Sequence, residues 1–237
     1  INAFDLRKLH TPGTLVKEIL RPAPMASLNM GLTDTLSAEA YYQWQWNAFR
    51  FDPVGTFFSG ADVVGAGQRN AYIPSSVLGE APGTFGDIGA GIQEGINVVP
   101  FEADRKPPKG KQFGLSMRFK PKGADTEYAL YFERYHDKLP FTTLFTDPAL
   151  STRNVANIGY YNEYGKDKNL FGASFNTKAG PVAVGGEISY RPRDSVAIDG
   201  SVPLAGQYSI FEASNADAND RITVRGYKEE KKFQAHL

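Results

Sequence analysis

The residues that most often carry chemistry are few and scattered in this sequence. Its three histidines are His10, His136 and His236, and no two of them have the spacing of a metal site. Cysteine is absent, which excludes a thiol nucleophile, a disulfide framework and a cysteine metal centre. His136 precedes Asp137 at the end of an expected strand, where a structural hydrogen bond is favoured over a catalytic role. We therefore expect no metal and no cofactor.

Short motifs of hydrolases and nucleotide-binding proteins are incomplete here. "GLSMR" and "GASFN" begin like the turn that exposes a serine nucleophile in many hydrolases, but both lack its final glycine. "GAGQRN" and "GAGIQEG" miss both phosphate-binding patterns, so their glycines indicate loop flexibility. The sequence predicts that the protein is not an enzyme.

An acidic stretch near the C-terminal end offers oxygen ligands. "EASNADANDR" contains Glu212, Asp217, Asn219 and Asp220, whose side chains could bind calcium in an external loop. The spacing and the glycine of a helix–loop–helix calcium site are missing, however. A solvated polar loop is the favoured interpretation.

The clearest periodic signal is "LSAEAYYQWQWNAFRF", from Leu36 to Phe51. Every second residue is apolar, and most of the residues between them are polar, which is typical of a strand with two unlike faces. A strand in a soluble sandwich usually has about five or six residues. The longer alternation predicts a membrane-crossing strand of about 9–11 residues that continues into a loop.

Similar alternation recurs along the chain and predicts hairpins with short turns. The alternating segments are residues 28–32, 113–119, 127–133, 171–176, 182–191 and 233–237. Between the hairpins lie long segments, residues 52–111, 137–168 and 192–220. Short turns on one side and long loops on the other are typical of outer-membrane β-barrels.

One further stretch, "NIGYYNEYGKDKN" at residues 157–169, also has strand character. Counting it as a full crossing would place the long segment 192–220 on the side of the short turns. We therefore expect it to be loop structure, such as a hairpin that protrudes beyond the bilayer.

The expected fold is all-β: part of a transmembrane antiparallel β-barrel with short periplasmic turns and long external loops. A large soluble β-sandwich with a polar outer face is the alternative that periodicity leaves open. Residues expected to line the lumen are Glu39, Gln43, Gln45, Asn47, Arg118, Glu133, Glu187 and Arg191. Residues expected to face the membrane are Tyr42, Trp44, Trp46, Leu130, Phe132, Phe171 and Phe175.

The four charged residues expected inside the lumen admit two interpretations. Glu133, Glu187, Arg118 and Arg191 could brace the barrel through ion pairs, or they could line the path of a solute. Bracing is favoured, because charges inside a barrel need partners whatever passes through it.

The overall composition excludes several classes of protein. Lysine plus arginine and aspartate plus glutamate both number 26, so no net charge attracts nucleic acid, and no nucleic-acid-binding module is present. The sequence has no run of 18 apolar residues, which excludes a membrane-spanning helix.

Several runs together resemble a known family. These are "NAFDLRKLHTPG", "SLNMGLTDTLSAEAYYQWQW", "FGLSMRFKP", "YHDKLP", "LFGASFNT" and "GEISYRP". They resemble a proteobacterial outer-membrane β-barrel family that is named only as a domain of unknown function, and the resemblance covers nearly the whole chain in order. Its members are often encoded near a second periplasmic protein family and an RND/MMPL-type lipid exporter. The resemblance implies a bacterial outer-membrane location and the surrounding lipid as a partner.

The function implied by this resemblance is transport. We expect a channel or transporter for hydrophobic small molecules or lipids, working with a periplasmic protein and an inner-membrane RND-type pump. The glycine-rich segment 52–111 is expected to fold inward as a plug, with Phe57, Phe58, Val63, Val64 and Tyr72 lining an apolar pocket. A structural or adhesive protein with partner-binding external loops is the alternative.

Residues 1–237 are expected to form a single barrel segment that is incomplete. The chain is shorter than the family it resembles, and it contains seven expected crossings. Bacterial single-chain barrels close with an even number of strands.

Overall fold

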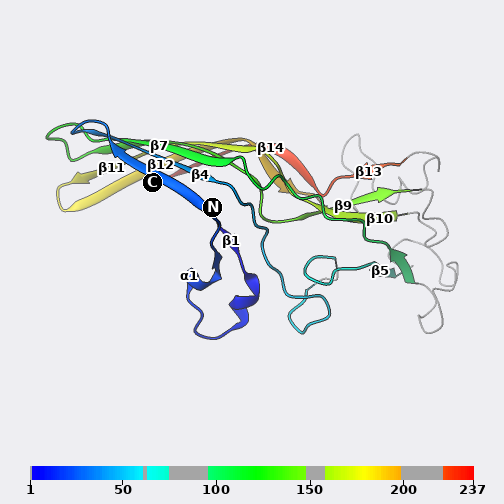
Figure 1. The fold of residues 1–237 in the computed structure, drawn as a ribbon. Coiled ribbons are helices and arrows are strands. Elements are labelled where there is room, and N and C mark those ends of the chain that lie inside the picture. The colour runs from blue at the N-terminus through cyan, green and yellow to red at the C-terminus, as the bar shows by residue number, and fades with distance from the viewer. Residues whose placement is uncertain (1, 61–62, 75–95, 148–157, 199–220) are drawn as a thin grey trace.

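A computed structural model describes residues 2–60, 63–74, 96–147, 158–198 and 221–237. Its main element is an antiparallel sheet of seven strands in the spatial order β14-β12-β11-β8-β7-β4-β3 (Figure 1). The strands are β3 (Met25–Gly31), β4 (Leu36–Gln43), β7 (Gln112–Phe119), β8 (Glu127–Tyr135), β11 (Lys168–Ala179), β12 (Val182–Ala197) and β14 (Tyr227–His236). They are the seven strands that alternation predicts, in the predicted order.

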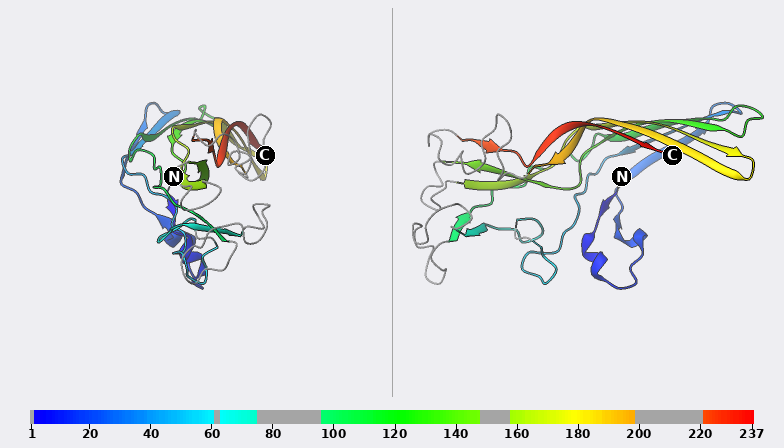
Figure 2. Two further views of the ribbon diagram at one scale, coloured as in Figure 1. Left: turned by 90° about the vertical axis from the view of Figure 1, so that its right-hand side faces the viewer. Right: turned by 180° about the vertical axis from the view of Figure 1, so that it is seen from behind.

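The connections of this sheet alternate between short and long. Residues 32–35, 120–126 and 180–181 form short turns at one end of the sheet. Gly123 and Gly180 have φ angles of 78° and 64° in two of these turns, a conformation that glycine adopts without steric cost. The long connections lie at the opposite end of the sheet, as Figures 1 and 2 show. The predicted division into short turns and long loops is therefore confirmed.

A second, smaller sheet lies at the end with the long connections. It has the order β10-β9-β13 and consists of β9 (Phe141–Thr146), β10 (Ile158–Glu163) and β13 (Thr223–Val224). Next to it, β5 (Ala71–Pro74) pairs with β6 (Ile96–Val99). Val99, Ile158 and Tyr160 form a buried apolar cluster here. The stretch 157–169 thus contributes a strand outside the main sheet, as expected from the parity of the connections.

The N-terminal segment packs against the connection that follows β4. It contains β1 (Ala3–Phe4), the 3₁₀ helix η1 (Leu6–His10), the short helix α1 (Val16–Ile19) and β2 (Leu20–Arg21), which pairs with β1. Arg50 donates its backbone N–H to the carbonyl of Phe4 at 2.9 Å, and its own carbonyl accepts from Leu6 at 2.9 Å. The ring of Phe4 lies 5.0 Å from that of Phe49.

The alternation of Leu36 to Phe51 overestimates the length of the strand, because β4 ends at Gln43. Trp46 lies beyond the strand and is buried, with its ring edge-on to Tyr164 at 4.8 Å. Trp44 also lies beyond the strand and is half exposed. Trp44 and Trp46 therefore both follow the last residue of β4, and the structure does not place them in a row on that strand.

The described part of the chain is all-β, with antiparallel sheets and very little helix. Among the described residues, β3 and β14 form the two edges of the seven-stranded sheet and do not pair with each other. Figure 2 shows the sheet as an arch, with the N-terminal segment on its inner side. No helix in these residues is long and apolar enough to cross a membrane.

Candidate functional site: the polar face of the seven-stranded sheet

The strand register divides the sheet into an apolar face and a polar face. On the apolar face, two rows of cross-strand neighbours run through all seven strands without a polar residue. The first row is Met30, Ala38, Met117, Leu130, Ala173, Ile188 and Ala235. The second row is Leu28, Ala40, Leu115, Phe132, Phe171, Tyr190 and Phe233.

Most of the large side chains in these apolar rows are exposed. Leu130, Leu115 and Phe233 have 63%, 51% and 66% of their surface accessible. Soluble monomeric proteins rarely expose a continuous apolar patch of more than a few hundred Å². The apolar face of this sheet therefore requires an apolar environment or an apolar partner.

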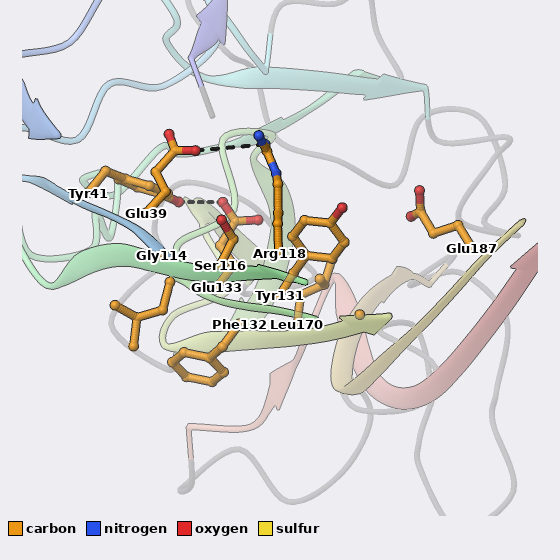
Figure 3. Close-up of a pocket in the computed structure, with 12 residues that line it drawn as sticks. Glu39, Tyr41, Gly114, Ser116, Arg118, Tyr131, Phe132, Glu133, Leu170 and Glu187 are labelled. Atoms are coloured by element: carbon orange, nitrogen blue, oxygen red, sulfur yellow. Dashed lines mark hydrogen bonds and ion pairs between the residues drawn. The ribbon is translucent and has the colours of Figure 1, made fainter. Parts of the chain in front are cut away.

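The opposite face carries polar residues in the same register. One row is Asn29, Glu39, Ser116, Tyr131, Gly172, Ser189 and Gln234. The next is Gly31, Ser37, Arg118, Ala129, Ser174, Glu187 and His236. In Figure 3 the side chains of Glu39 and Arg118 point to one side of the strands and Phe132 points to the other.

The middle of the polar face forms a groove of about 380 Å³ that combines carboxylates, a guanidinium and two tyrosines. Arg118 forms an ion pair with Glu39, with 3.8 Å between Nη2 and Oε2. The hydroxyl of Tyr41 donates to the carboxylate of Glu133. These contacts link β4 to β7 and, across β7, to β8 (Figure 3).

The structure brings half of the predicted lumen residues into this groove: Glu39, Arg118, Glu133 and Glu187. Arg191 lies farther along β12, where its guanidinium donates to the Gln234 side chain at 2.6 Å. Ion pairs are expected from the sequence among Arg118, Arg191, Glu133 and Glu187. In the structure Arg118 pairs instead with Glu39, which is outside that set. The side chain of Glu187 forms no ion pair with another of the described residues, and its backbone lies in the sheet between Ser174 and His236.

The other three predicted lumen residues are not in the groove. Gln43 is buried at the end of β4. Gln45 and Asn47 follow the strand, where the Gln45 amide donates to Asn47 at 3.3 Å. Their separation from the groove follows from the early end of β4.

The residues predicted to face the membrane divide in the same way. Tyr42, Leu130, Phe132, Phe171 and Phe175 lie on the apolar face of the sheet. Trp44 and Trp46 do not, because both lie beyond the end of β4, and Trp46 is buried.

Of the residues predicted to line an apolar pocket in segment 52–111, the structure describes the surroundings of Phe57, Phe58 and Val63. Phe57 is 94% exposed, and the ring of Phe58 stacks on His10 at 4.0 Å, beside the N-terminal segment. Val63 packs instead against the buried cluster at Val99. Residues 75–95 and the side chain of Tyr72 lie outside the described part, so the plug stays a prediction.

Sequence reasoning missed a buried polar layer between the main sheet and the long connections. Lys168 is 1% exposed, and its Nζ lies 2.6 Å from Oε1 of Glu229, across β12. Ser195 donates to the carboxylate of Asp137 at 2.6 Å, and burial raises the pKa of that carboxyl above its usual value. The ordinary signal of a buried residue is apolar character, so alternation alone could not identify these side chains.

His136 belongs to this layer and has a structural role, as favoured from the sequence. Its Nδ1 accepts from the backbone N–H of Asp167 at 2.9 Å, and its Nε2 lies 3.2 Å from the carbonyl of Gly110. Burial lowers the pKa of the imidazole, and these partners suit the neutral ring with its proton on Nε2. Both ring nitrogens are therefore occupied by backbone groups.

Lys138 lies two residues after His136, and burial changes the pKa of its amine as well. Its Nζ donates to the side-chain oxygen of Gln112 at 2.8 Å, and the ring of Trp46 lies 5.8 Å away. Burial lowers the pKa of this amine to about 8. The Lys138 amine therefore has the Gln112 amide and the Trp46 indole as its neighbours.

No group of three or more potential metal ligands occurs in the described ranges. The acidic stretch with Glu212, Asp217, Asn219 and Asp220 lies outside those ranges, and calcium binding there stays a prediction.

The fold and its two unlike faces define the molecule as an all-β protein built on an antiparallel sheet. The family model described as "Protein of unknown function (DUF1302)" matches residues 1–237, and the chain belongs to that family. The expected membership of a family named only as a domain of unknown function is thereby confirmed. No curated protein and no solved structure matches the chain.

Proposed function

We propose that this chain forms part of the wall of a β-barrel in the bacterial outer membrane, with the apolar face toward lipid and the polar face toward a water-filled passage. The observation that carries the proposal is the pair of exposed apolar rows across all seven strands. A soluble monomer rarely exposes such a large apolar surface to water, whereas in a bilayer the lipid tails cover it and keep it out of water.

Four of the seven strands are long enough to cross a bilayer, whereas β3, β4 and β7 have 7, 8 and 8 residues, and the connections also support the proposal. β8, β11, β12 and β14 contain 9, 12, 16 and 10 residues. A tilted strand needs about 9–11 residues to cross the hydrocarbon core. Short turns at one end and long connections at the other are the arrangement of outer-membrane barrels.

Transport is the function that the polar face supports best. The groove carries Glu39, Glu133, Glu187 and Arg118, which are stable beside water and not beside lipid. The cargo that we propose, hydrophobic small molecules or lipids handed on with a periplasmic protein and an inner-membrane RND-type pump, rests on the family resemblance. The proposal assigns no catalytic role.

A structural or adhesive role is the second candidate, and one observation favours it. The long connections build a packed unit around Val99, Ile158 and Tyr160, and a rigid unit of this kind could present a binding surface. Adhesion and transport make different demands, since only transport needs a continuous passage.

Two adjacent residues on β7 provide the test of the membrane proposal. Met117 is 47% exposed on the apolar face, and Ser116 lies on the polar face. Met117→Arg should strongly reduce assembly into the outer membrane, because arginine facing the bilayer centre costs about 2–4 kcal/mol. Ser116→Arg should assemble normally. In a soluble protein the exposed Met117 position would accept arginine as readily as the half-buried Ser116 position, and equal assembly of the two variants would overturn the proposal.

The choice between transport and adhesion needs a separate measurement. The assembled barrel to which this chain contributes should conduct ions when it is inserted into planar lipid bilayers. A folded, membrane-inserted protein without conductance, whose cells lose surface attachment when the gene is deleted, would favour the adhesive role.

A further inference from the structure

Tyr41 lies flat over a glycine of the neighbouring strand. Tyr41 and Gly114 are direct cross-strand partners on the polar face. A Cβ atom built on Gly114 would lie 2.2 Å from Cε1 and 2.8 Å from Cζ of the Tyr41 ring. No real side chain tolerates such a distance, so the ring occupies the space that glycine leaves. In this position its hydroxyl reaches Glu133 on β8, the strand beyond Gly114 (Figure 3).

A second pair repeats this arrangement less tightly. Tyr131 and Gly172 are cross-strand partners on the same face, and a Cβ on Gly172 would lie 3.3 Å from Cδ2 of Tyr131. The Tyr131 hydroxyl lies 2.9 Å from Oγ of Ser174. Both tyrosines therefore lie along the wall of the groove rather than projecting from it.

The hydrogen bonds alone do not explain this placement. A tyrosine on a strand stands roughly perpendicular to the sheet unless a neighbour allows it to lean. Gly114 allows Tyr41 to lean fully, since any side chain at this position would meet the ring. Gly114 thus leaves the space in which the Tyr41 ring lies. In that position the Tyr41 hydroxyl donates its hydrogen bond to the Glu133 carboxylate.

We infer that Gly114 and Gly172 are positioning residues that keep the rings of Tyr41 and Tyr131 against the wall, and that these pairs set the open width of the passage. The inference rests on the proposed function, because it assumes that the polar face borders a passage. It identifies the tyrosine–glycine pairs, rather than the charged residues, as the elements that control the size of the solutes that pass.

The substitution Gly114→Ala provides the test. The clash involves the ring of a flexible side chain, so the ring can swing off the wall while the backbone keeps its place. Gly114 does not have a positive φ angle, so alanine causes no backbone strain there. The displaced ring would stand in the groove, break the bond to Glu133 and narrow the passage.

The sheet offers matched controls for this substitution. A Cβ on Gly185, on the polar face, would come no nearer than 3.6 Å to any neighbouring atom. A Cβ on Gly186 would lie 2.4 Å from the ring of Phe175, but on the apolar face. Gly185→Ala therefore adds a methyl group to the polar face without displacing a ring. Gly186→Ala displaces a ring, but on the apolar face.

The measurement is single-channel conductance, in planar bilayers, of the assembled barrel that contains this chain, with folding checked by heat-modifiable electrophoretic mobility. We expect lower conductance for Gly114→Ala, a smaller loss for Gly172→Ala, and wild-type conductance for Gly185→Ala and Gly186→Ala. Adding Tyr41→Ala to Gly114→Ala should restore conductance to at least the wild-type value, because no ring remains to obstruct the passage.

The possible failures are distinguishable. A conducting wild-type protein whose Gly114→Ala variant is folded and conducts equally would overturn only the inference. An equal loss of conductance in Gly186→Ala would also overturn it, since the effect would then come from altered packing of the sheet. A folded wild-type protein that forms no channel would overturn the proposed function and the inference with it.

Discussion

The indole N–H of Trp46 donates a hydrogen bond to the backbone carbonyl of Asp137, with 3.1 Å between nitrogen and oxygen. Trp46 lies in the connection after β4, and Asp137 lies in the connection after β8. The same two segments meet again where Phe49 donates its backbone N–H to the carbonyl of Lys138 at 3.0 Å. These contacts thus join two long connections to each other at one end of the sheet.

The two tryptophans should differ sharply in substitution and in fluorescence. Trp46→Phe removes the donor to Asp137 and should lower the free energy of unfolding by about 1 kcal/mol, because a part-buried carbonyl loses its partner. Trp44→Phe should have little effect, since Trp44 is 50% exposed.

Denaturant unfolding and acrylamide quenching provide the measurements for these variants. Fluorescence of the Trp44→Phe variant, which reports on Trp46 alone, should be shielded from acrylamide. Equal quenching of the two single-tryptophan variants would contradict the buried position of Trp46.

His136 should make stability depend on pH. Burial lowers the pKa of its imidazole below the ordinary value of 6.5. The folded state therefore favours the neutral ring, and the resulting stability is fully present above pH 6.5 and is lost as the pH falls through the lowered pKa. Urea unfolding followed from pH 7.5 downward should show this loss in the wild type.

The histidine variants should separate this effect from other acid sensitivity. His136→Gln should be less stable at pH 7.5 but should lose less stability on acidification than the wild type. His236 is exposed at the end of β14, so His236→Gln should retain the wild-type dependence. An identical pH profile for the His136 variant and the wild type would show that another group titrates.

The ion pair of Lys168 and Glu229 should contribute measurably to stability. Lys168 is buried and Glu229 is its carboxylate partner at 2.6 Å. Glu229→Gln should cost roughly 1.5–3 kcal/mol, because it leaves a buried ammonium without its charged acceptor.

The control is the ion pair of Lys228 and Glu230, the two residues that flank Glu229 on β14. Lys228 and Glu230 also lie 2.7 Å apart, but their side chains are 66% and 51% exposed. Glu230→Gln should cost less than about 1 kcal/mol. Thermal unfolding of both variants gives the comparison, and similar shifts in Tm would mean that burial of Lys168 does not strengthen the pair.

Alternation predicted the main sheet well because the pattern is set by neighbouring residues. Leu115, Met117 and Phe119 occupy one face of β7, and Ser116 and Arg118 occupy the other, as their spacing of two requires. The hairpin turns are equally local, and Gly180 marks one of them. These features depend on a few consecutive residues and can be predicted from the sequence.

The ends of the strands and the buried polar layer depend on residues far apart in the chain. Trp46 continues the alternation of β4, but it contacts Asp137, 91 residues farther along the chain, and Tyr164, which is farther still, and it lies outside the sheet. Lys168 is the last residue of the segment 137–168 that the sequence predicts to be a loop, and its burial depends on Glu229, which lies beside it from a distant part of the chain. Among the groove residues, the polar face was predictable, whereas the pairing of Arg118 with Glu39 required the register between strands.

The order of the sheet has a consequence for how such proteins change in evolution. Each strand pairs only with its predecessor and successor among the sheet strands. Duplication or deletion of one hairpin would therefore widen or narrow the sheet without rewiring any other strand. Such a meander can also assemble by successive addition of hairpins, since every pairing is with a strand already in place. Relatives of different length can thus share one architecture and differ in hairpin number.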